Sequence, residues 1–116
     1  MMRNDKENII VVLTFKFSLH LIQYCEQLEL KKKFIISRQL LRSGTSIGAN
    51  TREAQNAESK ADFIHKFKIA AKEADETQYW LMLCKESDNY PLPDSLLQEL
   101  EIIIRVMSKI ISSSKK

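Results

Sequence analysis

The chain of 116 residues contains very little glycine and proline, with only two of each. Sandwiches and barrels need many tight turns, and glycine and proline supply most of them. Their scarcity argues against an all-β architecture and predicts a few long elements. The length suits one domain, since domains commonly hold about 100–150 residues. We therefore expect a single domain covering residues 1–116.

Residues that ligate metals are also scarce. The two cysteines, Cys25 and Cys84, form no C-x-x-C pair, and a zinc ribbon or a dense disulfide framework needs such pairs. A di-metal centre in a helical bundle needs two Glu-x-x-His pairs, whereas this chain offers only Asp62-x-x-His65. The uncharged runs are shorter than the roughly 18 apolar residues that span a membrane. We expect no metal, no other cofactor, no membrane partner and a reducing, cytoplasmic location.

What the sequence does contain is helical periodicity. Apolar residues recur at alternating gaps of three and four, which places them on one helix face. Ser59 and Ser95, followed three residues later by Asp62 and Gln98, predict capped helix starts, and the prolines after Asn89 end a helix. This all-α pattern predicts an up-down-up-down four-helix bundle. The predicted helices cover about residues 6–31, 34–58, 60–88 and 94–112.

Residues 44–48 match G-x-S-x-G, the nucleophile elbow of serine hydrolases. That motif needs a strand before the serine and a parallel sheet beneath it. Here both flanks of Ser46 have helical periodicity, and His65, the one histidine that follows, falls on another predicted helix. The pattern therefore indicates no catalytic residue, and we predict that the protein is not an enzyme.

The same glycines have a structural explanation. Gly44 and Gly48 lie on one stripe of small residues, and such a stripe lets a second helix backbone approach closely. Each glycine inside a helix costs up to about 1 kcal/mol relative to alanine, so a packing benefit is expected. We predict close helix packing between Gly44 and Gly48 and the alanines Ala70 and Ala74 of the third helix.

Basic residues gather in the second predicted helix. Residues 32–58 hold five cations against two acids, a surplus equal to the formal charge of +3 of the whole chain. The three arginines share the face opposite the apolar stripe, where forked guanidiniums can contact phosphates. The alternative is a solvated face in which arginines only aid solubility. The candidate nucleic-acid-binding residues are Lys32, Lys33, Arg38, Arg42 and Arg52.

Large apolar residues also occur outside the predicted core. On the third helix they lie off the main stripe, and on the second helix one of them borders the arginine face. A lone bundle would leave them partly in water, so they indicate a protein interface, for which we favour self-association. The candidate interface residues are Leu41, Ile69, Tyr79, Trp80 and Leu83.

One block of sequence in the second and third predicted helices has a distinctive set of residues. They are 38–50, Glu53, Ala54, Ser59, Asp62, Phe63, Lys66, Ile69, Ala70, 72–74, Glu76 and 79–81. This block resembles the 23S rRNA intervening-sequence protein family. The resemblance implies a left-handed up-down bundle that assembles into a ring-like homopentamer. Some relatives are encoded inside 23S rRNA genes, and a related branch, the accessory variability determinant of diversity-generating retroelements, binds nucleic acid and a reverse transcriptase.

Together these observations predict a non-enzymatic oligomeric bundle that binds RNA or another structured nucleic acid through the basic face of the second helix. The alternative is a scaffold whose surface docks a partner protein, such as an enzyme, and whose charge is incidental. Phosphate binding weakens steeply with salt, whereas an apolar docking surface does not, so salt dependence separates the two.

Overall fold

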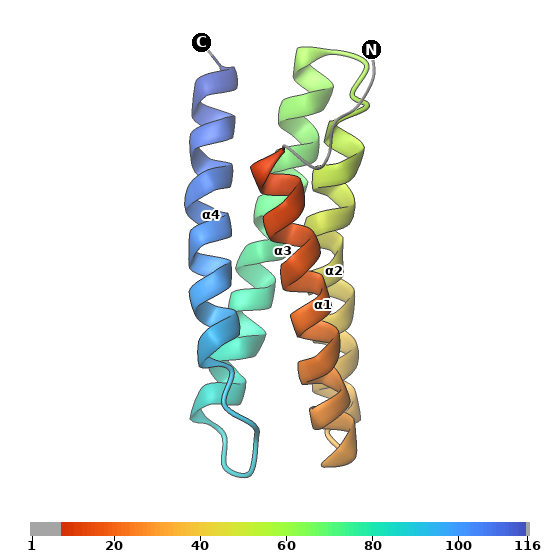
Figure 1. Ribbon diagram of the computed structural model, residues 1–116, viewed down its shortest axis with the longest axis vertical. Coiled ribbons are helices and arrows are strands. Elements are labelled where there is room, and N and C mark those ends of the chain that lie inside the picture. Colours follow the sequence, from red (N-terminus) through yellow and green to blue (C-terminus); the bar gives the residue numbers. More distant parts are fainter. Residues whose placement is uncertain (1–7, 116) are drawn as a thin grey trace.

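The computed structural model describes residues 8–115, and within that range it contains four helices and no strand. Each helix runs antiparallel to the next, which confirms the all-α expectation and the up-down arrangement (Figure 1). Helix α1 packs beside α2 and α4, and α3 packs beside the same two helices. Thus α1 lies diagonally opposite α3, and α2 lies diagonally opposite α4. The helices are α1 Ile9–Leu30, α2 Phe34–Ala54, α3 Lys60–Glu86 and α4 Asp94–Ser114.

Helices α2 and α3 end two or more residues earlier than the sequence predicts, while α1 ends one residue earlier and α4 continues two residues further. Helix α2 stops at Ala54 rather than at residue 58, because Asn56 and Ala57 donate to carbonyls three residues back and tighten the chain into a turn. Helix α3 stops at Glu86 rather than 88, since Ser87 is extended and Asn89 adopts a left-handed φ of 63°. The predicted start of the first helix at residue 6 lies outside the described residues.

The two predicted helix caps have different outcomes. Ser59 caps α3 as predicted, because its hydroxyl accepts a hydrogen bond from the Asp62 backbone N–H at 3.0 Å. The Ser95 prediction is wrong: α4 begins at Asp94 after Pro93, and no side chain caps it. Pro93 and Leu96 are both buried, so docking of this turn on the core sets the helix start, and Ser95 falls inside the first turn.

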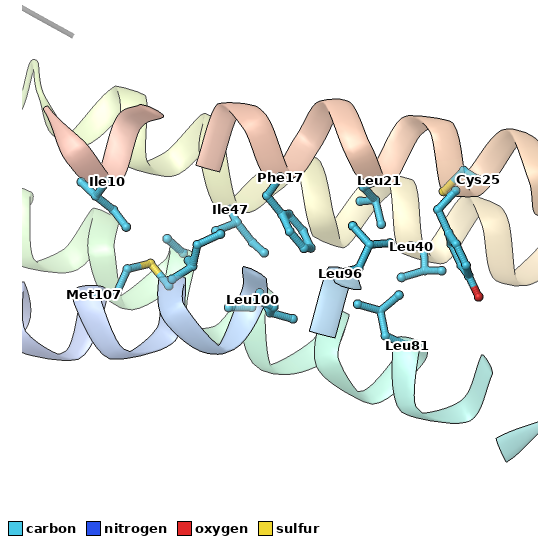
Figure 2. Close-up of a cluster of buried hydrophobic side chains, with 14 of the residues drawn as sticks. Ile10, Phe17, Leu21, Cys25, Leu40, Ile47, Leu81, Leu96, Leu100 and Met107 are labelled. Atoms are coloured by element: carbon cyan, nitrogen blue, oxygen red, sulfur yellow. The ribbon is translucent and has the colours of Figure 1, made fainter. Parts of the chain in front are cut away.

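The core is a continuous apolar column along the bundle axis, built from all four helices (Figure 2). Phe17 and Phe67 are its largest buried side chains, and each such burial contributes about 1.5–3 kcal/mol. Buried hydroxyls are satisfied locally or between helices. The Thr77 hydroxyl donates to Ser43 at 2.9 Å across α2 and α3, and the Ser37 hydroxyl donates to the Cys25 carbonyl at 3.3 Å across α1 and α2.

Gly44 and Gly48 mark a close approach of α2 to α1. A Cβ on Gly44 would collide with Leu21 Cδ2, and a Cβ on Gly48 would lie 3.4 Å from the Thr14 carbonyl oxygen. Gly44 also faces α3, because its Cβ would lie 3.6 Å from Thr77 Cγ2. The predicted partners Ala70 and Ala74 are fully buried in the core cluster, but neither is among the nearest atoms to the two glycines.

Helix α1 is apolar on two opposite sides. Residues on its inner side, such as Phe17 and Leu21, are completely buried, while Phe15 and Leu19 on the outer side are 60% and 47% exposed. As a result, α1 is long and apolar enough to cross a membrane by length and hydropathy alone, despite the short uncharged runs. The buried side of α1 belongs to the core cluster that residues of all four helices form. A core helix of a bundle can therefore have the length and hydropathy of a membrane-spanning helix.

Candidate functional site

Two of the candidate phosphate-binding residues project freely from α2. Arg38 and Arg52 are exposed, and neither has a hydrogen-bond or ion-pair partner among residues 8–115. The one acid within α2, Glu53, is held by the ammonium of Lys66 on α3 at 3.1 Å. Fourteen residues of helix separate the two arginines by about 21 Å. They can therefore reach two phosphates that lie several nucleotides apart.

Arg42 is exposed like Arg38 and Arg52, but it has ion-pair partners on α3. Its guanidinium forms ion pairs with Glu76 and, at 3.4 Å, with Glu73, both on α3. Glu76 also accepts a hydrogen bond of 2.9 Å from the Trp80 indole. Because two carboxylates already satisfy this guanidinium, Arg42 fastens α2 to α3.

Lys32 and Lys33 lie in the turn between α1 and α2. Lys32 adopts a left-handed φ of 62°, and the Lys33 backbone N–H donates to the Leu28 carbonyl at 2.8 Å, which closes the end of α1. The Lys33 ammonium lies 4.7 Å from the centre of the Tyr90 ring. Arg52 lies near the opposite end of α2, about 28 Å along the helix from Lys33. The five predicted cations therefore form no single cluster.

The serine of the G-x-S-x-G motif lies inside α2. The Ser46 hydroxyl donates to the Arg42 carbonyl at 2.6 Å, four residues earlier in the same helix. His65 is exposed on α3 and has no partner in the described part of the chain. No group of three or more histidine, cysteine, aspartate or glutamate residues between positions 8 and 115 could hold a metal ion.

The predicted interface residues divide into exposed and half-buried side chains. Tyr79, Leu83 and Leu41 are 57%, 41% and 38% exposed. Ile69 is half-buried, and Trp80 is half-buried against the core with its ring 5.3 Å from Tyr79 in an edge-to-face contact. Trp80 thus belongs in part to its own bundle. Around Tyr79, the exposed Met82 enlarges the apolar area. We call Tyr79, Met82 and Leu83 the α3 patch.

A second apolar surface was missed by the sequence interpretation. Phe15, Leu19 and Ile22 are exposed on the outer side of α1, and half-buried Val12 extends the row. We call these four residues the α1 stripe. Their positions follow gaps of three, four and three, so the helical spacing was visible in the sequence. It was missed because the apolar residues of this segment were attributed to the core.

The α1 stripe adjoins a shallow apolar groove between α1 and α2. The groove has a volume of about 210 Å³, with Phe15 and Val11 on one side, Gly48 and Ala49 on the other, and Arg52 beside them. The groove exists because small residues of α2 lie where larger side chains would fill the gap. Leu41 lies on the edge of α2 that faces α1, one turn before Thr45 in the groove wall.

Burial makes the two cysteines unreactive. Desolvation raises the pKa of the Cys25 thiol to about 11, although hydrogen bonding with the Ser37 side chain opposes the shift. The pKa of Cys84 is also raised, mainly by burial. Burial raises the pKa of Tyr24 above its ordinary value, and its hydroxyl donates to the Pro91 carbonyl at 2.6 Å. At neutral pH all three groups are protonated parts of the core.

These features define a class: an all-helical four-helix bundle with two exposed arginines on one helix and exposed apolar side chains on two others. The family description "23S rRNA-intervening sequence protein" matches residues 6–113. The chain belongs to this family, as the resemblance in the sequence implied. No match was found among curated proteins.

A solved structure with the same fold supports this membership. It is a protein of unknown function from the S23 ribosomal protein family of Bacteroides thetaiotaomicron, 39% identical to this chain. The alignment covers 88% of this chain and 97% of the other, with a TM-score of 0.83. Neither description names an enzymatic activity.

Proposed function

We propose that this protein is a non-enzymatic, self-associating cytoplasmic protein that binds structured RNA through the outer face of α2. The observation that carries the proposal is the state of Arg38 and Arg52, both exposed and without a hydrogen-bond or ion-pair partner among residues 8–115. A guanidinium that has no protein partner remains available to a phosphate oxygen, with which it forms a short, charge-assisted pair. The family description, which refers to the 23S rRNA, agrees with an RNA ligand.

Self-association is part of the proposal because one copy binds weakly. Two phosphate contacts give a small electrostatic affinity, which physiological salt largely removes. Several copies in one assembly, five in the homopentamer that the resemblance implies, would engage one folded RNA together and raise the avidity by orders of magnitude. The α1 stripe and the α3 patch support self-association, since both leave large apolar side chains in water.

A second candidate function is a scaffold that docks a partner protein on one of these apolar surfaces. The exposed fraction of Phe15, 60%, favours it, because a Phe on the outer side of a helix is an anchor for protein contacts. In this case binding would persist at high salt, and the arginines would not matter.

Charge reversal on α2 tests the RNA proposal. The double variant Arg38→Glu and Arg52→Glu should lose retention of a structured RNA at about 50 mM salt, because the phosphate contacts become repulsive. Arg42 is left intact, since its reversal would also disturb the packing of α2 on α3.

The matched control reverses the same number of charges on the diagonal helix. Arg105 and Lys109 are both exposed on α4, and Arg105→Glu with Lys109→Glu should leave RNA retention unchanged. Equal loss in both variants would point to net charge alone. Equal binding by the α2 variant and the unmodified protein would favour the scaffold function.

A further inference from the structure

We infer that a shallow pocket beside the turn between α1 and α2 takes an unpaired nucleotide of the bound RNA, with its base on the Phe34 ring and the phosphates on Lys32 and Arg38. The inference rests on the proposed RNA binding and specifies the class of RNA: a strand with unpaired bases, as in a loop or a bulge, rather than a continuous duplex. It adds Phe34, which was not among the residues predicted from the sequence, to the contact surface.

The pocket lies at the end of the bundle where the α1–α2 turn and the α3–α4 loop are side by side (Figure 1). It has a volume of about 280 Å³. Aromatic rings stack on bases and cations bind phosphates, so its lining offers both contacts that an unpaired nucleotide makes. Within the described part of the chain no acid lines it. The lining residues are Lys32, Lys33, Phe34, Ile35, Ile36 and Tyr90.

Phe34 is the aromatic residue that is open to a base. Its side chain is 47% exposed, and it belongs neither to the core cluster nor to the side chains packed against that cluster. Tyr90, by contrast, packs against the core, and the Lys33 ammonium lies 4.7 Å from the centre of its ring. One face of Tyr90 is thus covered, whereas the ring of Phe34 is accessible and is not needed for the packing of the bundle.

The cations on either side of Phe34 are placed for phosphates. Arg38 follows Phe34 by four residues, one turn and about 6 Å along the axis, so the two share a side of α2. Lys32 is exposed and, like Arg38, has no hydrogen-bond or ion-pair partner among residues 8–115. A strand whose base lies on Phe34 therefore has an available cation in both directions.

The backbone at Lys32 does not favour a lysine. The N–H groups of Lys32 and Lys33 donate to the Glu29 and Leu28 carbonyls at 2.9 and 2.8 Å, the pattern that closes a helix on a left-handed residue. Glycine commonly occupies that position, because a φ of 62° strains a residue that has a Cβ. The turn thus explains the conformation, and a cation beside the pocket accounts for the residue.

The acids near the turn lie outside the pocket. Residues 28–38 contain four cations and one acid, Glu29, whose carboxylate accepts a hydrogen bond of 3.0 Å from the Ser37 hydroxyl. Exposed Glu86 and Asp88, at the end of α3 and in the loop that follows, are not part of the lining. The surplus of positive charge is therefore on the α2 side of the pocket, where Arg38 lies.

The test compares two RNAs with equal numbers of phosphates, a hairpin with an unpaired loop and a fully paired duplex. The hairpin carries the fluorescent base 2-aminopurine in its loop. The unmodified protein should bind the hairpin more tightly and change the 2-aminopurine fluorescence, because only an unpaired base can stack on a side chain. Phe34→Leu should lower the hairpin affinity by about fivefold or more and leave the duplex affinity unchanged.

Three further variants separate stacking from apolar contact and from charge. Phe34→Trp should keep the preference for the hairpin, since it restores a ring, whereas leucine keeps only apolar bulk. Lys32→Asn should weaken hairpin binding at low salt, because asparagine tolerates the left-handed φ but carries no charge. The matched control is Ile102→Ala, 46% exposed on α4, which should change neither affinity. Circular dichroism checks that each variant stays helical.

The contrary results distinguish this inference from the proposed function. Equal binding of both RNAs, with no effect of Phe34→Leu, would overturn the inference alone. Binding of neither RNA would overturn the proposed function as well. Displacement of the hairpin by an equal concentration of AMP would contradict an RNA strand as the ligand and assign the pocket to a free nucleotide.

A membrane surface is the other ligand that this end of the bundle would suit. Leu30 and Ile35 are 85% and 80% exposed beside the same lysines, and anionic lipids attract such a basic, apolar surface. The protein should not float with vesicles of phosphatidylcholine and phosphatidylserine. Flotation that Lys32→Asn abolishes would assign the turn to lipid and contradict the inference.

Discussion

Arg38, Arg42 and Arg52 share a helix face, yet their surroundings give them different roles. Arg42 is occupied by Glu73 and Glu76, whereas Arg38 and Arg52 have no partner within residues 8–115. The charge of Arg42 is partly compensated by two carboxylates, so in the proposed function it contributes less to RNA affinity than the two unpaired arginines. The proposed phosphate-binding face therefore depends mainly on Arg38 and Arg52.

Burial of Cys25 should make the stability of the protein depend on pH in the alkaline range. The pKa of Cys25 rises from an ordinary value of 9.0 to about 11 in the folded protein, so above pH 9 the unfolded chain releases its proton first. The contribution of this thiol to the free energy of unfolding is fully present below pH 9. It is lost as the pH rises from 9 to 11, and the loss amounts to roughly 2–3 kcal/mol. Urea titrations at pH 8, 9, 10 and 11 measure the loss.

Replacement of Cys25 separates the contribution of its thiol to this pH dependence from that of the other buried groups. Cys25→Ala should reduce the slope of stability against pH between 9 and 11 by about 1.4 kcal/mol per unit. Tyr24 and Cys84, whose pKa values are also raised, continue to contribute in the variant. An unchanged slope would mean that Cys25 ionises as easily in the folded chain as in the unfolded one.

A few buried contacts fix the position of α2 along the helix axes of its neighbours α1 and α3. The hydrogen bonds from Ser37 to the Cys25 carbonyl and from Thr77 to Ser43 join neighbouring helices inside the core. A shift of one turn would break both inter-helix hydrogen bonds, at a net cost of about 0.5–1.5 kcal/mol each. Gly44 adds a steric constraint, since Leu21 occupies the space of its missing side chain.

The two glycines of α2 should respond differently to alanine. Gly44→Ala should destabilise the protein by about 1–2 kcal/mol, because its Cβ collides with the buried Leu21 and overpacking exceeds the gain in helix propensity. Gly48→Ala should be neutral or stabilising by up to about 1 kcal/mol, since its contacts start at 3.4 Å. Urea denaturation of both variants measures the difference. The packing account is wrong if Gly44→Ala is the more stable of the two.

Sequence periodicity predicted the helices well because the apolar spacing and the Ser59 cap are local signals. It could not predict the partners of Arg42 or of Gly44, since these depend on how far one helix is shifted and rotated relative to another. The α1 stripe is a different case. Its spacing was present in the sequence, but a helix that is apolar on two sides gives no sign of which side is buried.

At the scale of the whole molecule, the apolar surfaces and the arginine face lie on three different helices. The α1 stripe and the α3 patch occupy diagonal helices, and α2, which carries Arg38 and Arg52, lies between them and adjoins both. Arg52 lines the groove beside Phe15 of the α1 stripe, so a partner that covers the stripe also approaches this arginine. In the proposed function, self-association strengthens RNA binding through avidity.

The proposed binding of RNA by several copies together is tested by the salt dependence of RNA affinity. On a duplex each neutralised phosphate contributes somewhat under one unit to the slope of log affinity against log salt, so two arginines in one copy account for a slope of at most about two. We predict a steeper slope for the unmodified protein if it binds RNA as an assembly. A variant that light scattering shows to be monomeric should bind RNA more weakly, with a slope near two or below. An equal slope in both proteins, or RNA affinity that does not change with salt, would contradict the proposed function.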